Sequence, residues 1–388
     1  MKRIDRRDFL KTGFTGAAGI VISPVVFGSK ISDQNENIIT RVLGKTGMKI
    51  PVISFGVMRA DNASLCKAAY DNGIKLFDTA NGYQNGNNEA MLGNLFKDVP
   101  RNSFYLATKV KPAGVDRQGK PGPETTAEDF LSRFATSLKR LQMDYVDILY
   151  VHDVSNVELL DYKPIINALE RLKKEGKIKY AGFSTHRNEH IVIDAAASRN
   201  VYDVILTSYN FRHDNLEELN KAIRKATSAG IGIVAMKTMA GGKLVNASAA
   251  LKWALSNPDI HTTIPGMTTF DHLEVNLKVL ADINLTEQEK SDLVAYSSSP
   301  GLFCGGCSKC LPACPKNLPV PDLMRAYMYA YGYSNALMAH SLLQELGIES
   351  NPCKDCNECS VACSREFDVR QKIADISRLC NVPVEFLT

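Results

Sequence analysis

The stretch VDILYVH, residues 146–152, is a mostly apolar run that ends on a histidine. Its length and its Val, Ile and Tyr content are typical of a strand that is buried on both faces of a sheet. Amphipathic stretches flank such runs, as in residues 125–141, where Leu131, Phe134 and Leu138 share one face. Similar apolar runs lie at residues 52–56, 74–78, 104–109, 178–184, 203–210, 231–237 and 261–265. Eight strand–helix units predict an α/β fold, a closed (β/α)8 TIM barrel.

An open, doubly wound sheet is the alternative for alternating strands and helices. Such a sheet would rarely need eight units, and no G-x-G-x-x-G follows the first strand. The GKTG at residues 44–47 lacks the upstream glycine of a phosphate-binding loop, so we interpret it as a turn before the barrel. The closed barrel is therefore our prediction.

Polar side chains stand where the strands end. Asp78 closes the second run, Tyr83 follows in the next loop, Lys109 closes the third run and His152 closes the fourth. The carboxyl ends of TIM-barrel strands form one rim, and catalytic residues collect there. Taken singly, these residues could cap a helix, face solvent or lie in the core. Together, at successive positions of one rim, they predict a reaction site.

These motifs resemble those of the aldo-keto reductases. FDTANGY (77–83) resembles the family's loop with Asp and Tyr five residues apart, LATKV (106–110) its strand-three lysine, and DILYVHD (147–153) its strand-four histidine. The resemblance covers about residues 40–285. It implies an oxidoreductase that acts on a carbonyl or alcohol substrate with NADP or NAD, and it implies that Asp78, Tyr83, Lys109 and His152 are catalytic.

Elementary chemistry gives each of the four residues a role in carbonyl reduction. The developing alkoxide needs a proton, and a free tyrosine, with a pKa near 10, is a weak acid at neutral pH. A neighbouring Lys109 ammonium would favour the phenolate and lower the pKa of Tyr83, while Asp78 holds that lysine charged. His152 could hydrogen-bond the carbonyl oxygen and orient it.

The implied nicotinamide site departs from the family pattern. Thr185 stands where the family has Asn, and Leu206 stands where it has Gln. Backbone amides could still hold a pyrophosphate, so the choice between NADPH and NADH stays open. The residues that we expect to contact the cofactor are Ser184, Met236, Lys237, Gly266 and Asn276.

Eight of the ten cysteines form two blocks of equal spacing. The first, Cys304, Cys307, Cys310 and Cys314 before Pro315, matches the C-x2-C-x2-C-x3-C-P run of bacterial ferredoxins. The second is Cys353, Cys356, Cys359 and Cys363. In two-cluster ferredoxins the fourth cysteine of a run ligates the other cluster. We therefore expect two 4Fe–4S clusters, one on Cys304, Cys307, Cys310 and Cys363, the other on Cys353, Cys356, Cys359 and Cys314.

Zinc and a disulfide framework are the alternatives for these cysteines. The repeated spacing of three thiols and then one argues against both. The residues between the two blocks have a helical pattern, which resembles the α-helical type of dicluster ferredoxin.

The amino terminus reads RRDFLK at residues 6–11, followed by an apolar run over residues 12–28. This stretch resembles the twin-arginine signal R-R-x-F-L-K, so we expect the export machinery to carry the folded protein to the periplasm. No A-x-A cleavage site is visible, and an uncleaved signal that anchors the protein in the membrane stays open. A cytosolic chain with a basic start is the alternative.

Composition and motifs together divide the chain of 388 residues into three parts. We predict an export signal at residues 1–30, an aldo-keto reductase-like barrel at 40–298 and a small, mainly helical, ferredoxin-like iron–sulfur domain at 299–388. Residues 1–29 contribute +3 of the net charge of +4, so the remainder gives no case for nucleic acid.

The two domains leave three hypotheses on function. The first is a carbonyl or alcohol oxidoreductase whose clusters transfer electrons. The second is an electron-transfer protein that keeps the barrel as a scaffold, and the third gives the clusters a purely structural role. Because nicotinamide moves two electrons as hydride and a cluster moves one, the first hypothesis needs a flavin carrier or a redox partner protein.

Overall fold

The computed structural model describes residues 38–240, 246–298, 303–307, 309–356, 359–364, 366 and 368–387. The export signal predicted at residues 1–30 lies outside them. Within these ranges, none of the helices combines the length and the apolar character that a bilayer crossing requires.

Eight parallel strands form one sheet in the order β10-β9-β8-β7-β6-β5-β4-β3. Isolated bridges from Ile53 to Thr263 and from Gly56 to Gly266 join its first and last strands and close the barrel. The strands are β3 (Phe55–Gly56), β4 (Leu76–Asp78), β5 (Tyr105–Val110), β6 (Val146–Val151), β7 (Ile178–Thr185), β8 (Val204–Ser208), β9 (Gly232–Met236) and β10 (Thr262–Thr263). The predicted TIM barrel is confirmed.

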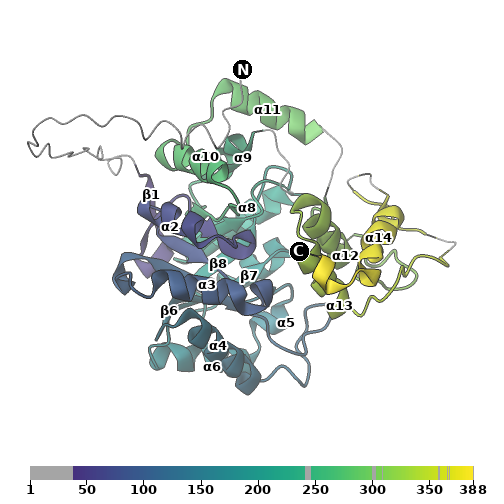
Figure 1. The fold of residues 1–388 in the computed structure, drawn as a ribbon, viewed down its shortest axis with the longest axis horizontal. Helices are drawn as coiled ribbons and strands as arrows, with labels where there is room; N and C mark the ends of the chain where they lie inside the picture. The colour runs from purple at the N-terminus through teal and green to yellow at the C-terminus, as the bar shows by residue number, and fades with distance from the viewer. Residues whose placement is uncertain are drawn as a thin grey trace, which may run out of the picture. The chain divides into compact units, whose positions relative to one another are not determined.

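Helices follow the strands and cover their outer face, as α3, α4 and α6 do in Figure 1. Phe130 and Phe134 show why they pack there, since both are buried on the apolar side of α4. The helices of this region are α2 (Ala63–Asp71), α3 (Asn87–Phe96), α4 (Ala127–Leu141), α5 (Val157–Leu160), α6 (Lys163–Lys174), α7 (Glu189–Ala196), α8 (Leu216–Ser228), α9 (Ala247–Ser256), α10 (Phe270–Ala281) and α11 (Glu287–Ser298).

A hairpin of β1 (Thr40–Val42) and β2 (Lys49–Pro51) precedes the barrel. The GKTG segment forms its turn, with Gly47 in the left-handed region that favours glycine. Leu43 and Ile50 from the hairpin are buried in one cluster with barrel residues such as Leu76 and Val234. The hairpin therefore packs against the interior of the barrel, and the interpretation of GKTG as a turn is confirmed.

The C-terminal region is helical and has a core of its own. Its elements are α12 (Val320–Tyr327), a π-helical turn η6 (Met328–Gly332), α13 (Ala336–Glu345), α14 (Val369–Ser377) and the short 3-10 turns η7 (Arg378–Asn381) and η8 (Val384–Phe386). Leu323, Leu343 and Ile376 are fully buried in this core, with Cys314 and Cys353 at its edge. The helical pattern predicted between the two cysteine blocks is confirmed.

Candidate functional site

The ends of three neighbouring strands bring Asp78, Lys109 and His152 to one rim of the barrel. Asp78 ends β4, Lys109 lies near the end of β5, and His152 directly follows β6. Asp78 is 3% exposed and Lys109 is 1% exposed, and the lysine Nζ donates hydrogen bonds to the Asp78 carboxylate and, at 2.7 Å, to the Thr79 carbonyl oxygen. The two side chains therefore form a buried ion pair.

Tyr83 completes this group from the turn after β4. The Nζ atom of Lys109 lies 3.5 Å from the Tyr83 hydroxyl oxygen. The Tyr83 ring stands edge-on to the His152 ring, with 6.1 Å between their centroids. The structure thus brings together all four of the residues that the sequence indicated as catalytic.

Burial governs the ionisation of the group. It raises the pKa of Asp78 and lowers the pKa of Lys109, and the ion pair between them opposes both shifts. Burial, with a smaller contribution from Lys109, lowers the pKa of His152 to about 3. The imidazole is therefore neutral at physiological pH and can orient a carbonyl by hydrogen bonding.

The pKa of Tyr83 moves in the opposite direction to the one we expected from the sequence. Burial raises it, and the charge of Asp78 and the nearby Tyr333 raise it further. Because the Lys109 ammonium is paired with the Asp78 carboxylate, little of its charge remains to stabilise a phenolate. Tyr83 is therefore held as a neutral phenol.

Residues from the C-terminal region lie against this rim, which the sequence did not indicate. The rings of Tyr329 and Tyr333 stack with centroids 5.9 Å apart. Both tyrosines lie near Tyr83, since Tyr333 helps to raise the pKa of Tyr83 and Tyr83 helps to raise the pKa of Tyr329. Arg59, which follows β3, stacks on Tyr333 at 5.0 Å and donates a hydrogen bond to its carbonyl oxygen. The alternation of tyrosines in YMYAYGY (327–333) was the available sequence signal.

A network of buried ionic side chains joins the same two regions. Asp153, next to His152, lies 3.5 Å from Arg325 of α12 and 3.1 Å from His186, which follows β7. Arg187 lies 3.7 Å from Asp322 of α12. Burial alone would raise the pKa of Asp153, but the charges of Arg325 and Arg187 outweigh it and hold that pKa well below its usual value. The carboxylate therefore stays charged and ties α12 to the barrel.

Three of the residues expected to contact a nicotinamide present groups that suit one. Ser184 is buried at the end of β7, where its hydroxyl oxygen accepts a hydrogen bond from the Asp153 backbone at 3.0 Å, and its own proton has no acceptor among the described residues. Gly266 is exposed after β10. Asn276 is 2% exposed, and its Oδ1 is buried without a hydrogen-bond partner among the described residues. These groups fit a polar ligand such as a nicotinamide dinucleotide.

The other two expected contacts lie at the end of β9. Met236 is its last residue, and Lys237 follows with a left-handed backbone. The Nζ atom of Lys237 lies 3.5 Å from Nδ1 of His186. Thr185 stands where the family has Asn, and it donates a hydrogen bond to the Arg187 carbonyl oxygen. Leu206 stands where the family has Gln, and it is fully buried in the barrel interior. Neither residue therefore presents a free polar group to a cofactor.

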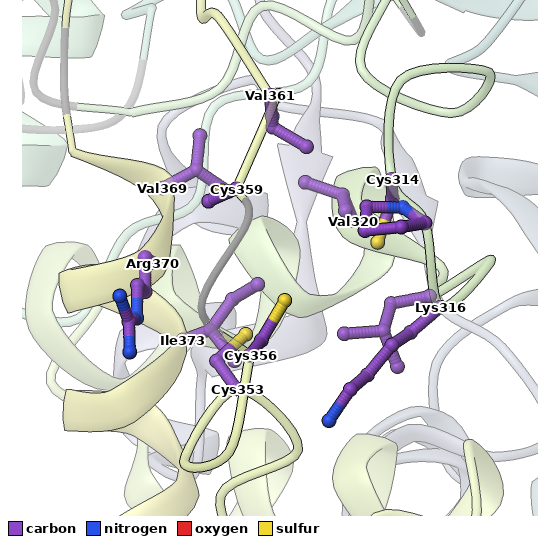
Figure 2. A pocket seen from close by; sticks show the side chains of 12 residues that line it. Cys314, Lys316, Val320, Cys353, Cys356, Cys359, Val361, Val369, Arg370 and Ile373 are labelled. Carbon is purple, nitrogen blue, oxygen red and sulfur yellow. The ribbon is translucent and has the colours of Figure 1, made fainter.

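The cysteines group by electrostatic proximity into two sets of four. Burial raises the pKa of Cys310 to about 12, and the nearby thiols of three other cysteines contribute to this rise, namely Cys304, Cys307 and Cys363. The pKa of Cys353 is likewise raised by burial and by three nearby thiols, those of Cys314, Cys356 and Cys359. Figure 2 shows Cys314, Cys353, Cys356 and Cys359 around one pocket, with Val320 and Ile373 beside them. Each set takes three cysteines from one block and the fourth from the other.

This donor set suits two 4Fe–4S clusters, each with four thiolates. All ten cysteines lie in the described ranges, and each has a free thiol there. In the described part of the chain no three His, Cys, Asp or Glu side chains converge tightly enough for one metal ion. Gly306, with φ +81°, donates its N–H to the Cys304 sulfur at 3.3 Å, as is common around cluster ligands.

Known proteins resemble both parts of the chain. The family model described as the aldo/keto reductase family matches residues 53–249, and that of the 4Fe-4S dicluster domain matches residues 303–368. L-galactose dehydrogenase from Arabidopsis thaliana is 27% identical over 299 residues, which cover 65% of this chain and 91% of that protein. An uncharacterized oxidoreductase from Bacillus subtilis is 26% identical over 302 residues, 63% of this chain and 92% of that one.

Solved structures agree on the barrel. The holo form of an aldo-keto reductase from Bacillus halodurans superposes with a TM-score of 0.55 at 24% identity. The match covers 66% of this chain and 96% of that one, and it shows the fold alone.

Proposed function

This chain belongs to the aldo/keto reductase family, and from that premise we propose that it interconverts a carbonyl compound and its alcohol at Asp78, Tyr83, Lys109 and His152. It is an oxidoreductase that also carries a 4Fe-4S dicluster domain. The observation that carries the proposal is the convergence of the four side chains, with the Tyr83 hydroxyl 3.5 Å from the lysine Nζ. A carbonyl oxygen near Tyr83 and His152 would meet two neutral hydrogen-bond donors.

Each residue has a distinct task in this proposal. Tyr83, held as a neutral phenol, donates its proton to the developing alkoxide. Lys109 lies beside the hydroxyl and can donate a hydrogen bond to the tyrosine oxygen as the proton leaves. Asp78 holds Lys109 in place, and neutral His152 orients the carbonyl.

A nicotinamide, NADP or NAD, would supply the hydride when bound. We propose that Ser184, Gly266 and Asn276 hold it, since these residues present a hydroxyl, an exposed backbone and an unpartnered amide oxygen. Met236 would lie near the nicotinamide if the cofactor occupies the end of β9.

We propose that the two cysteine sets hold clusters that carry single electrons between the barrel and a redox partner protein or flavin carrier. One observation favours the alternative, an electron-transfer protein with a scaffold barrel. Tyr329, Tyr333 and Arg325 of the C-terminal region lie against the rim where a substrate would enter.

The proposed location is the periplasm, reached by twin-arginine export. The basis is RRDFLK at residues 6–11, together with a cofactor that must be inserted before export. Replacing Arg6 and Arg7 with Lys should leave cluster-loaded protein in the cytoplasm. Normal export of that variant would exclude the proposal.

Turnover of Tyr83→Phe tests the enzyme proposal. Anaerobic holoprotein, NADPH or NADH and a panel of aldehydes and aldoses are the reagents. Loss of the proton donor should reduce carbonyl reduction by about 10²–10⁴-fold. Tyr150→Phe is the matched control, because the Tyr150 hydroxyl is buried in β6 without a hydrogen-bond partner in the described ranges. Equal rates in both variants would favour the scaffold alternative.

A further inference from the structure

Lys237 occupies an unusual place on the barrel rim. It follows β9 with φ +55°, a left-handed backbone that is unfavourable for a non-glycine residue and persists only where the surroundings fix it. Its Nζ atom lies 3.5 Å from Nδ1 of His186. Its side chain therefore points toward the segment that follows β7.

The first cysteine set lies against that same segment. Gly306, two residues after Cys304, packs so closely on the His186 carbonyl oxygen that a β-carbon there would stand 3.1 Å from it. Lys237 and Cys304 are near enough for each charge to act on the other. A lysine of the barrel thus lies near Cys304, one of the four cysteines of the first set.

The second set has a lysine of its own, which differs in two respects. Lys316 follows Cys314 by two residues, and its Nζ donates a hydrogen bond at 2.9 Å to the carbonyl oxygen of Pro352, the neighbour of Cys353. It belongs to the C-terminal region and is exposed, whereas Lys237 belongs to the barrel and is partly buried. Water and salt screen an exposed charge more strongly than a buried one.

We propose that Lys237 raises the reduction potential of the cluster held by Cys304, Cys307, Cys310 and Cys363. One electron enters that cluster on reduction, no bond is made or broken, and the charge of an ammonium group near Cys304 would stabilise the added negative charge. The barrel thereby sets the potential of the cluster nearest to it. The inference rests on the clusters of the proposed function and is independent of carbonyl chemistry.

The test is a potentiometric titration of anaerobic, full-length holoprotein with dithionite and redox mediators, followed by electron paramagnetic resonance. Cys307→Ala identifies the signal of the first cluster by its loss. Lys237→Met should lower the potential of that cluster and leave the other unchanged. Lys316→Met is the matched control and should lower only the second potential, by less, and the shift should shrink more with added salt.

A charge-preserving variant and an assay of cluster content complete the test. Lys237→Arg retains the charge and should keep the wild-type potential, and iron and sulfide contents verify that each variant is loaded. Unchanged potentials in Lys237→Met, or equal shifts of both clusters, would overturn the proposal. So would weaker binding of NADPH at unchanged potentials, which would assign Lys237 to the nicotinamide. Neither substrate nor turnover enters the titration, so failure of the enzyme proposal would be seen separately.

Discussion

Removal of Lys109 should destabilise the barrel through the carboxylate that it leaves behind. Asp78 is 3% exposed, and its Oδ2 has no hydrogen-bond partner within the described ranges, so Lys109 is the main compensation for its charge. Leaving such a charge unpaired costs about 3–5 kcal/mol of unfolding free energy. With a slope of about 3 kcal/mol per molar urea, Lys109→Met should lower the unfolding midpoint by roughly 1–1.7 M.

The assay is urea unfolding of anaerobic holoprotein, followed by the fluorescence of Trp253. This residue is the single tryptophan of the chain and packs on Tyr209 at 5.2 Å between ring centroids, so its signal reports on the barrel. The double variant Asp78→Asn with Lys109→Met removes both charges and should lie within about 1–2 kcal/mol of wild type. The ion-pair argument would be refuted if the losses of unfolding free energy in Asp78→Asn and in Lys109→Met summed to the loss in the double variant within about 0.5 kcal/mol.

The same variant gives a pH test with a definite sign. Removal of Lys109 removes the ammonium that opposes the effect of burial, so the folded-state pKa of Asp78 should rise further above its unfolded value of about 3.9 than in wild type. The folded state then binds the proton more tightly than the unfolded state. The unfolding free energy of Lys109→Met should therefore fall as pH rises from about 4 to the raised pKa, and a wild-type-like pH profile would contradict the argument.

Three other predictions test the rim and the clusters. The rate of carbonyl reduction should stay flat from about pH 5 to 9, because the pKa of His152 is lowered to about 3 and that of Tyr83 is raised, and a pH–rate profile checks this. Cys363→Ala should remove the same paramagnetic signal as Cys307→Ala, although the two residues lie in different blocks, whereas Cys314→Ala should remove the other signal. Arg325→Met should lower the unfolding free energy by about 1–3 kcal/mol, seen as a lower melting temperature, because Asp153 loses a charged partner in a buried network.

The sequence predicted the barrel and the four rim residues because both depend on local patterns. An apolar run identifies a strand such as β6, and the residue that follows it, His152, must then stand on the rim. The cysteine sets could also be predicted from the sequence, since the spacing of each block indicates that its fourth cysteine belongs with the three cysteines of the other block. The boundaries of the strands differ from the expected runs by few residues, apart from the short β3 and β10.

The contacts between the C-terminal region and the rim could not be predicted from the sequence, because they depend on the packing of distant segments and not on local patterns. Tyr83 and Tyr333 are 250 residues apart, and no periodicity in either segment encodes their approach. The raised pKa of Tyr83 depends on this approach and on burial, so reasoning from Lys109 alone gave the wrong direction. The position of Lys237 depends on a left-handed backbone at the end of β9 and on the packing of Gly306, both of which are properties of the folded chain.

A structural role and a redox role for the clusters need not be alternatives. Each cysteine set joins the segment around residue 310 to the segment around residue 360, and α12, η6 and α13 lie between these segments in the chain. Bound metal contributes folding free energy, so the two clusters would hold α12 with its Arg325 and η6 with its Tyr329 against the barrel rim. The same ligation that carries electrons would then also keep the reaction site covered, and loss of either cluster should change both properties together.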